Sequence, residues 1–182
     1  GRRPPGGGCF GAAAVAAGLA WHAGLSAEQI VSGIQSFPGL AHRQELIGTK
    51  NGLSFVNDSK ATNAEAAAVA LRAYKNVYLL AGGQSKEGGL KAAMHDLDSV
   101  RGAFVYGECA ADFAQQLAAK PFPTQSFSTL EAAFGAALAT AEAESLEYAT
   151  ILLAPAAASW DQFSSFEARG DVFRALANTY LT

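Results

Sequence analysis

Cysteine and charge are both scarce in this sequence. Of its 182 residues two are cysteine and 16% are charged, with 16 Asp and Glu against 13 Lys and Arg. Cys9 and Cys109 form no CxxC pair and belong to no cluster with metal-ligand spacing, so we expect neither a disulfide framework nor a metal site. A net charge of −3 argues against nucleic acid or an anionic membrane as a partner. The lack of a cysteine framework favours the reducing cytoplasm, and we expect a monomer.

Long hydrophobic runs are also absent. The longest, residues 11–25, is rich in alanine, contains His22 and is shorter than a membrane span, and no signal-peptide cleavage pattern follows a basic start. Residues 1–10 are rich in glycine and proline and predict a flexible lead-in. We expect two helices within residues 11–38 and one larger domain over residues 39–182.

A phosphate-binding P-loop is missing as well. The pattern Gly-x-x-x-x-Gly-Lys-Ser/Thr does not occur in the sequence. Any nucleotide phosphate bound by the protein must therefore be held by groups outside this chain or by a different kind of loop.

The N-terminal part predicts helices followed by a hairpin. Residues 12–23 form the first expected helix, and a capping box from Ser26 to Gln29 opens a second that runs to about residue 37. Residues 44–50 and 53–57 are expected to pair across Asn51-Gly52, since this dipeptide best tolerates the positive φ angles of a two-residue turn.

From residue 53 onward, short apolar runs alternate with amphipathic stretches. This alternation predicts an α/β fold with a Rossmann-like, mainly parallel sheet, helices on both faces and an N-terminal helical appendage. A second capping box, Ser128 to Glu131, is expected to open one of the helices. The predicted strands are 53–57, 77–81, 103–106, 124–127 and 149–154, and the predicted helices are 63–73, 90–97, 110–119, 129–143 and 170–180.

Polar residues gather where three of these strands end, which is where open α/β sheets bind ligands. Residues 58–63 place Asp58, Lys60 and Thr62 on a strand-to-helix turn that suits a phosphate or carboxylate. The alternative is that Thr62 or Asn63 only caps the helix while Asp58 and Lys60 form a solvated ion pair.

Two further segments could contact an anion. The loop 82–89 carries four glycines and Lys86, although a flexible surface loop explains the same composition. His42-Arg43 follows a Pro-Gly stop, and an arginine there could grip phosphate when two domains close on it, or could simply be exposed.

The segment after the last strand combines small residues with aromatic ones. Residues 156–167 could form a small-molecule pocket walled by aromatic rings. The alternative is a helix capped by Ser159, with Trp160, Phe163 and Phe166 packed in the core at helical spacing.

In combination, these motifs resemble the C-terminal domain of the Mur ligase family, most closely the members that add D-glutamate. The resemblance covers about residues 39–173, and residues 11–38 resemble the end of the central ATP-binding domain. It departs from the family pattern at Ala154 and Ala157, where a Ser and a Cys are usual. The matching segments are Gly39-Leu40-Ala41-His42-Arg43, Asn57-Asp58-Ser59-Lys60-Ala61-Thr62-Asn63, Gly82-Gly83 with Lys86, Ala158-Ser159-Trp160-Asp161-Gln162-Phe163, and Phe166-Glu167-x-Arg169-Gly170.

The resemblance implies ATP-dependent amide formation in peptidoglycan synthesis. ATP would phosphorylate the carboxylate of UDP-N-acetylmuramoyl-L-alanine, and D-glutamate would attack the acyl phosphate. The UDP-sugar site, the P-loop and the Mg²⁺ ligands would lie in family domains that this chain lacks.

The resemblance also implies roles for individual residues. Lys60 would steady the transferring phosphate as a catalytic residue. The implied D-glutamate contacts are Thr62, Lys86, Ser159, Trp160 and Phe166, the last through its backbone, and the implied ATP contacts are His42, Arg43 and Asp58. A related domain that adds another amino acid, as in other Mur ligases or folylpolyglutamate synthase, and a non-catalytic binding module of the same fold remain alternatives.

Overall fold

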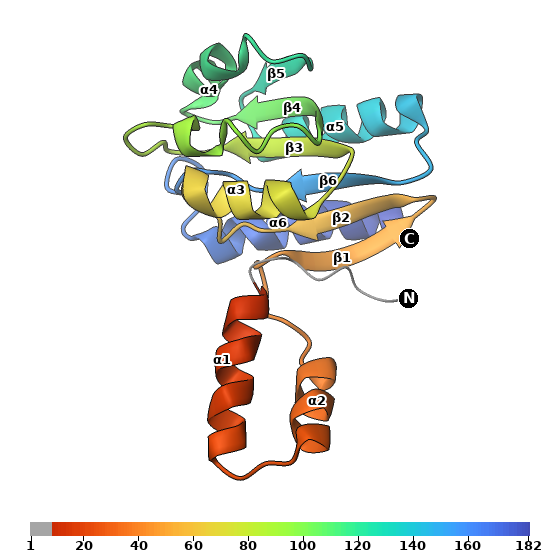
Figure 1. The fold of residues 1–182 in the computed structure, drawn as a ribbon. Helices are drawn as coiled ribbons and strands as arrows, with labels where there is room; N and C mark the ends of the chain where they lie inside the picture. Colours follow the sequence, from red (N-terminus) through yellow and green to blue (C-terminus); the bar gives the residue numbers. More distant parts are fainter. Residues whose placement is uncertain (1–8) are drawn as a thin grey trace.

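The computed structural model describes residues 9–182, so most of the predicted lead-in lies outside the described residues. A six-stranded sheet with the order β1-β2-β6-β3-β4-β5 forms its centre, and only β1 runs antiparallel to its neighbour (Figure 1). This confirms the predicted α/β fold class. The strands are β1 (Glu45–Lys50), β2 (Leu53–Asn57), β3 (Val77–Gly82), β4 (Val100–Tyr106), β5 (Thr124–Phe127) and β6 (Ala149–Leu153).

Helices cover both faces of the sheet because the central strands are apolar on both sides. Leu79 and Ala81 of β3 face α3 (Ala64–Ala73) and α4 (Ala110–Leu117), whereas Tyr78 and Leu80 face α5 (Leu130–Glu144) and α6 (Phe166–Leu181). Every residue of β3 and β6 is buried, as the continuous apolar runs predict. The alternation of side chains along each strand thus creates two separate core layers.

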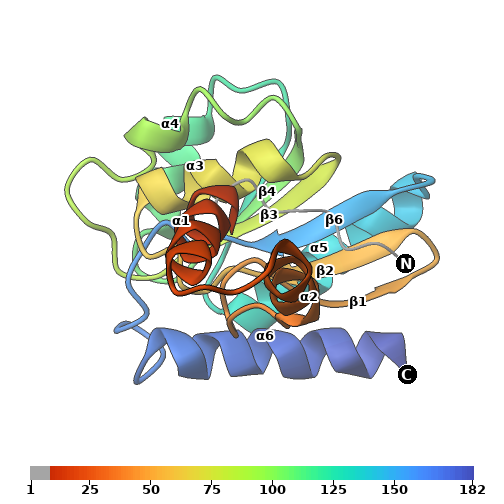
Figure 2. The same cartoon turned by 60° about the horizontal axis from the view of Figure 1, so that its bottom comes forward.

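The predicted hairpin joins β1 to β2. Asn51 and Gly52 have φ angles of 52° and 80°, the positive values of a tight two-residue turn. Beyond β1, α1 (Cys9–His22) and α2 (Ala27–Ser36) project away from the sheet (Figures 1 and 2). The predicted capping box at Ser26 and Gln29 is present at the start of α2. No helix within residues 9–182 is long and apolar enough to span a membrane.

Three predicted helix boundaries are wrong. Residues 90–97 contain only a short 3₁₀ turn, η1 (Lys91–Ala93), because Lys120 Nζ binds the Met94 carbonyl and local bonds run between residues three apart. Thr129 rather than Ser128 caps α5, since the Ser128 carbonyl accepts a bond from Gln162. The last helix begins at Phe166, four residues earlier than expected, because Ser165 caps it.

The turn at Gly52 yields a stability test. A Cβ on Gly52 would lie 2.1 Å from the Glu147 carbonyl oxygen, and its φ of +80° disfavours an L side chain. We expect Gly52→Ala to lower the free energy of unfolding, measured by urea denaturation, by about 1–3 kcal/mol. Gly135→Ala, in the middle of α5 with nothing within 4 Å of the added Cβ, is the matched control and should raise it by about 0.5–1 kcal/mol. Wild-type stability of Gly52→Ala would contradict this account of the turn.

Candidate active site

Three loops meet at the carboxyl ends of the neighbouring strands β2, β6 and β3. The loop after β2 is tied to the loop after β6 by a bond from Ala156 N to Ala61 O of 2.9 Å. The loop after β6 is tied to the loop after β3 by two bonds between Gln84 and Ala158, both of 2.9 Å. The structure therefore brings together the three segments that the sequence singles out.

The loop after β2 presents Lys60 to solvent. The ammonium of Lys60 lies 4.0 Å from the centre of the Phe166 ring, which attracts a cation through its π face. Thr62 is half-buried, and Asn63 rather than Thr62 caps α3 by accepting a bond from Ala66 N. The alternative of a solvated ion pair between Asp58 and Lys60 is wrong, because Asp58 is only 5% exposed and the ion pairs found among residues 9–182 do not include it.

Asp58 lies beneath the linker between α2 and β1, residues 37–44. Its carboxylate accepts a bond of 3.2 Å from Gln44 N. Burial raises the pKa of Asp58 from its ordinary value of 3.8 to about 6, while the Gln44 amide and the charge of Arg43 act in the opposite direction. The carboxyl group therefore changes charge close to physiological pH.

The loop after β3 leaves the sheet through two closely packed glycines. A Cβ on Gly83 would lie 2.1 Å from the Ala158 carbonyl oxygen, so this position excludes any side chain. The far end of the loop is fixed by Gln116, which accepts a bond from Leu90 N and donates to Asp112. Between these anchors Lys86 is exposed.

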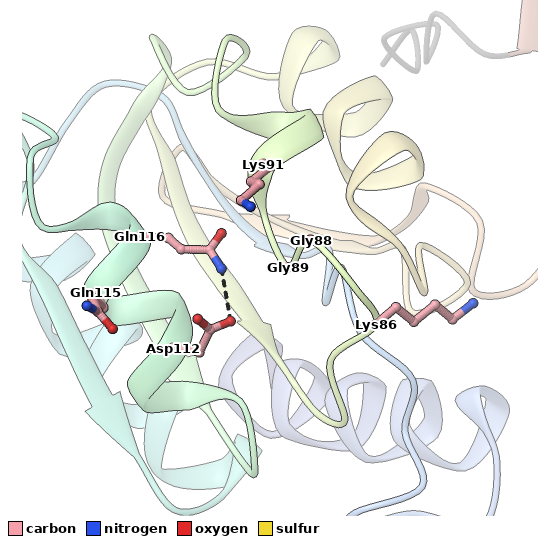
Figure 3. A pocket seen from close by; sticks show the side chains of 7 residues that line it. All are labelled: Lys86, Gly88, Gly89, Lys91, Asp112, Gln115 and Gln116. Atoms are coloured by element: carbon pink, nitrogen blue, oxygen red, sulfur yellow. Dashed lines mark hydrogen bonds between the residues drawn. The ribbon is translucent and has the colours of Figure 1, made fainter.

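Two cavities flank this loop. The larger, of about 440 Å³, lies between the loop and α4, and the Lys86 side chain points away from its Asp112 and Gln116 wall (Figure 3). The smaller, of about 280 Å³, lies between the loop and the start of α3, with Asn63, Lys86 and Ala156 in its lining. Of the two, the smaller cavity adjoins the strand-end loops, so we assign it to the candidate site.

The loop after β6 supplies a buried hydroxyl residue and an exposed indole. Ser159 is 3% exposed, whereas Trp160 is 67% exposed. The alternative of a helix capped by Ser159 is wrong, because residues 159–162 form a turn and α6 begins only at Phe166. Trp160 is therefore free to contact a ligand, while Phe163 packs against the core layer under α5 and α6.

The linker residues His42 and Arg43 differ in exposure. His42 is buried, and its Nδ1 lies 3.1 Å from Asn57 Nδ2, which also donates to Gly170 O. Since an amide nitrogen can only donate, Nδ1 accepts and Nε2 carries the proton, 3.8 Å from Asp171. Arg43 is exposed. The histidine thus anchors the linker, and the arginine is the member of the pair that can reach a ligand.

Three residues buried beneath the site, Arg169, Ser59 and Asn57, have no role predicted from the sequence. A signal for Arg169 exists in the spacing of α6, because Arg169, Gly170, Phe173 and Ala177 form its buried face. A charged side chain on the buried face of a helix is costly unless polar groups surround it, so Arg169 at this position predicts buried hydrogen-bond acceptors. Among the side chains that the structure describes, residues 13–182, no three or more His, Cys, Asp or Glu form a group that could hold a metal ion.

Comparison with known families decides what kind of domain this is. A family model described as "Mur ligase, glutamate ligase domain" matches residues 42–157. The chain belongs to the Mur ligase family. The family expected from the sequence motifs is thereby confirmed.

Two relatives of this Mur ligase chain are both named "UDP-N-acetylmuramoylalanine--D-glutamate ligase". The protein from Paramagnetospirillum magneticum is 46% identical over 86% of the chain and 34% of its own length. The protein from Rhodospirillum rubrum is 48% identical over 84% of the chain and 32% of its own length. The chain therefore spans about a third of the length of these relatives.

A solved structure confirms the fold of the Mur ligase chain. MurF from Acinetobacter baumannii superposes with a TM-score of 0.60 at 19% identity, over 86% of this chain and 34% of that one. At this level of identity the likeness concerns the fold alone.

The buried carboxyl group of Asp58 predicts a pH-dependent stability. Its pKa is higher in the folded state than in the unfolded state, so its contribution to stability is full below about pH 3.8 and is lost as the pH rises through about 6. Asp58→Asn keeps the acceptor for Gln44 N and abolishes the charge. We expect it to raise the free energy of unfolding by up to about 3 kcal/mol at pH 8 and to change it little at pH 4.

Urea denaturation at the two pH values measures this difference in the Mur ligase chain. Asp98→Asn is the matched control, since Asp98 is exposed and its charge is not buried. Destabilisation of Asp58→Asn at pH 8 would contradict the proposed cost of burying the charge.

Proposed function

We propose that this domain belongs to an ATP-dependent ligase that adds D-glutamate to UDP-N-acetylmuramoyl-L-alanine in the cytoplasm, during peptidoglycan synthesis. The observation that carries the proposal is the arrangement of Lys60, Lys86 and Ser159 on three joined strand-end loops. The names of relatives at 46% and 48% identity support it.

D-glutamate carries two carboxylates and needs charge-assisted donors held in a fixed arrangement. In our proposal Lys86 supplies the main positive charge, and Ser159 and Thr62 donate hydroxyl hydrogen bonds. The backbone at Phe166 and the exposed ring of Trp160 complete the pocket. Of these residues only Lys86 lines the cavity of about 280 Å³, which adjoins the other loops through Asn63 and Ala156.

ATP would approach from the linker side. The exposed Arg43 suits a phosphate group, and Asp58 suits a ribose hydroxyl, whereas the buried His42 ring would act by holding Arg43 in place. When bound, ATP supplies the phosphoryl group that activates the substrate carboxylate as an acyl phosphate. We propose that the Mg²⁺ ligands lie elsewhere in the full-length ligase.

Lys60 is the proposed catalytic residue. Its ammonium is exposed at the edge of the crevice and is held over the Phe166 ring. From there it could neutralise charge that develops on the transferred phosphoryl group, and charge neutralisation with positioning supplies most of the catalysis in such reactions. The attacking amine of D-glutamate would then meet an activated carbonyl.

We also propose that residues 11–38 form the end of a preceding ATP-binding domain, with the amino-acid-binding domain covering 39–182. The support is the exposure of apolar side chains on α1 and α2, which have no cover from the sheet domain. These side chains include Val15, Leu19, Trp21, Val31, Ile34 and Phe37. Such a surface is typical of an interface with another domain.

The chain alone should have no ligase activity. No P-loop occurs in its sequence. A P-loop neutralises phosphate charge, and this neutralisation is essential for phosphoryl transfer. Phosphate release from the purified chain with ATP, D-glutamate and the UDP-sugar should equal that of a heat-inactivated sample. Release above that background would contradict the division of roles proposed here.

In the full-length ligase, Ser159→Ala and Lys86→Met should each raise the KM for D-glutamate roughly 10- to 100-fold. A hydrogen bond to a charged group is worth about 1.5–3 kcal/mol, and these bonds exist before the amine attacks. The KM for ATP should change little. Lys60→Met, in contrast, should lower kcat more than amino-acid affinity.

Lys75→Met is the matched control, because Lys75 is exposed and follows α3 at the opposite edge of the sheet. Steady-state kinetics with D-glutamate, L-glutamate and ATP separate the alternatives. If Lys86→Met impairs the use of ATP and leaves the D-glutamate KM within about twofold of wild type, the loop binds nucleotide and the proposed pocket is wrong.

A further inference from the structure

Arg169 is a fully buried cation directly beneath the three strand-end loops. Its side chain is 0% exposed and it lies in the first turn of α6. The ion pairs found among residues 9–182 do not include it. A buried guanidinium without a carboxylate partner is costly unless other acceptors surround it.

Those acceptors come from all three loops. Arg169 Nε donates to Ser59 Oγ at 3.0 Å and Nη2 donates to Ser59 O at 2.9 Å. Nη1 donates to Gly82 O at 3.3 Å and to Ala157 O at 3.1 Å. Four donor contacts of one planar group thus join the ends of β2, β3 and β6.

Ser59 extends this set of contacts to the start of α6. Its hydroxyl accepts from Arg169 Nε and donates to Phe166 O at 2.7 Å, so both capacities of the oxygen are used in fixed directions. The backbone of Phe166 is therefore held by the same group that holds the loop after β2.

The loops are packed too closely around the guanidinium to be repositioned freely. A Cβ on Gly83 would come within 3.1 Å of Arg169 Nη1 as well as meeting the Ala158 carbonyl. Burial lowers the pKa of Arg169, while nearby Tyr106 and Asp161 raise it. An arginine remains charged under these conditions, so its hydrogen bonds keep their charge-assisted strength.

Each residue that accepts a hydrogen bond from Arg169 lies close in sequence to a side chain with a proposed role in binding or catalysis. Ser59 precedes Lys60, Gly82 begins the loop that carries Lys86, and Ala157 is two residues before Ser159. We propose that Arg169 is a positioning residue that does not touch the substrate. It sets the distance between two proposed D-glutamate contacts, Lys86 and Ser159, and their placement relative to Lys60. This inference rests on the proposed function.

A lysine cannot take over this role. Its ammonium has three donors at one point, whereas the guanidinium spreads its donors over a rigid plane that reaches three segments. Arg169→Lys therefore keeps the charge while loosening the loops relative to one another. Misplacement of binding groups by about 1 Å can cost about 100-fold in rate.

The test compares Arg169→Lys, Ser59→Ala and the double variant in the full-length ligase. We expect Arg169→Lys to raise the KM for D-glutamate roughly 10- to 100-fold. The KM for ATP should rise much less, because the proposed ATP contact Asp58 has bonds that do not involve Arg169. Its amide donates to Leu153 O, and its carboxylate accepts from Gln44 N. The two substitutions should be non-additive in their effect on D-glutamate, since both break the same contacts.

Phe173→Leu is the control for a general loss of stability. Phe173 is buried on the same face of α6 but packs against the ring of Phe134 in the core. It should lower the Tm without changing the D-glutamate KM. If Phe173→Leu has the same Tm as Arg169→Lys and raises the KM for D-glutamate equally, the positioning role is overturned.

Two other outcomes are decisive. If wild-type enzyme does not use D-glutamate, the proposed function fails, whatever the variants do. If wild type uses D-glutamate and Arg169→Lys leaves its KM within about twofold, only the inference on Arg169 fails. Should Arg169→Lys not fold, Ser59→Ala decides the matter, and an unchanged D-glutamate KM for it overturns the proposal.

Discussion

Parallel pairing of β2, β6 and β3 is the constraint on which the candidate site depends. These strands are neighbours in the sheet and run in the same direction, so their carboxyl ends meet at one edge. The chain must leave each strand by a sharp turn, and the buried turns must satisfy their backbone groups. Direct bonds between the loops meet part of this need, and the guanidinium of Arg169 meets much of the rest.

The electrostatics of the site follow from this layered arrangement. Beneath the loops, Arg169 is a buried cation, and Ser159 is buried within the loop after β6. In contrast, Lys60 and Lys86 are exposed and keep their hydration until a ligand arrives. Asp58 lies on the linker side, where burial raises its pKa to about 6. In the proposed function, an anionic amino acid and ATP would meet different parts of this site, so that the amine could attack a carboxylate of the other substrate once ATP has activated it.

Much of the fold could be predicted from local patterns. The apolar runs of β3 and β6 predict buried parallel strands, and Asn51-Gly52 predicts the hairpin, because each signal depends on a few adjacent residues. The 3₁₀ turn at Lys91–Ala93 could not be predicted, since the distant Lys120 binds the Met94 carbonyl. The start of α6 depends on a local signal, the cap Ser165, which the prediction missed. The inward orientation of His42 depends in the same way on Asn57 and Gly170. The motifs located the loops, but the contacts of Arg169 arise only when three distant segments meet.

We propose that these three loops together form a binding site selective for D-glutamate. Amide hydrogen exchange of the full-length ligase, with its nucleotide and UDP-sugar substrates bound, measures this. Saturating D-glutamate should slow exchange in peptides that cover residues 58–62, 83–89 and 157–166, and L-glutamate at the same concentration should not. Equal protection by both enantiomers, or protection by D-glutamate only outside these three segments, would contradict the account.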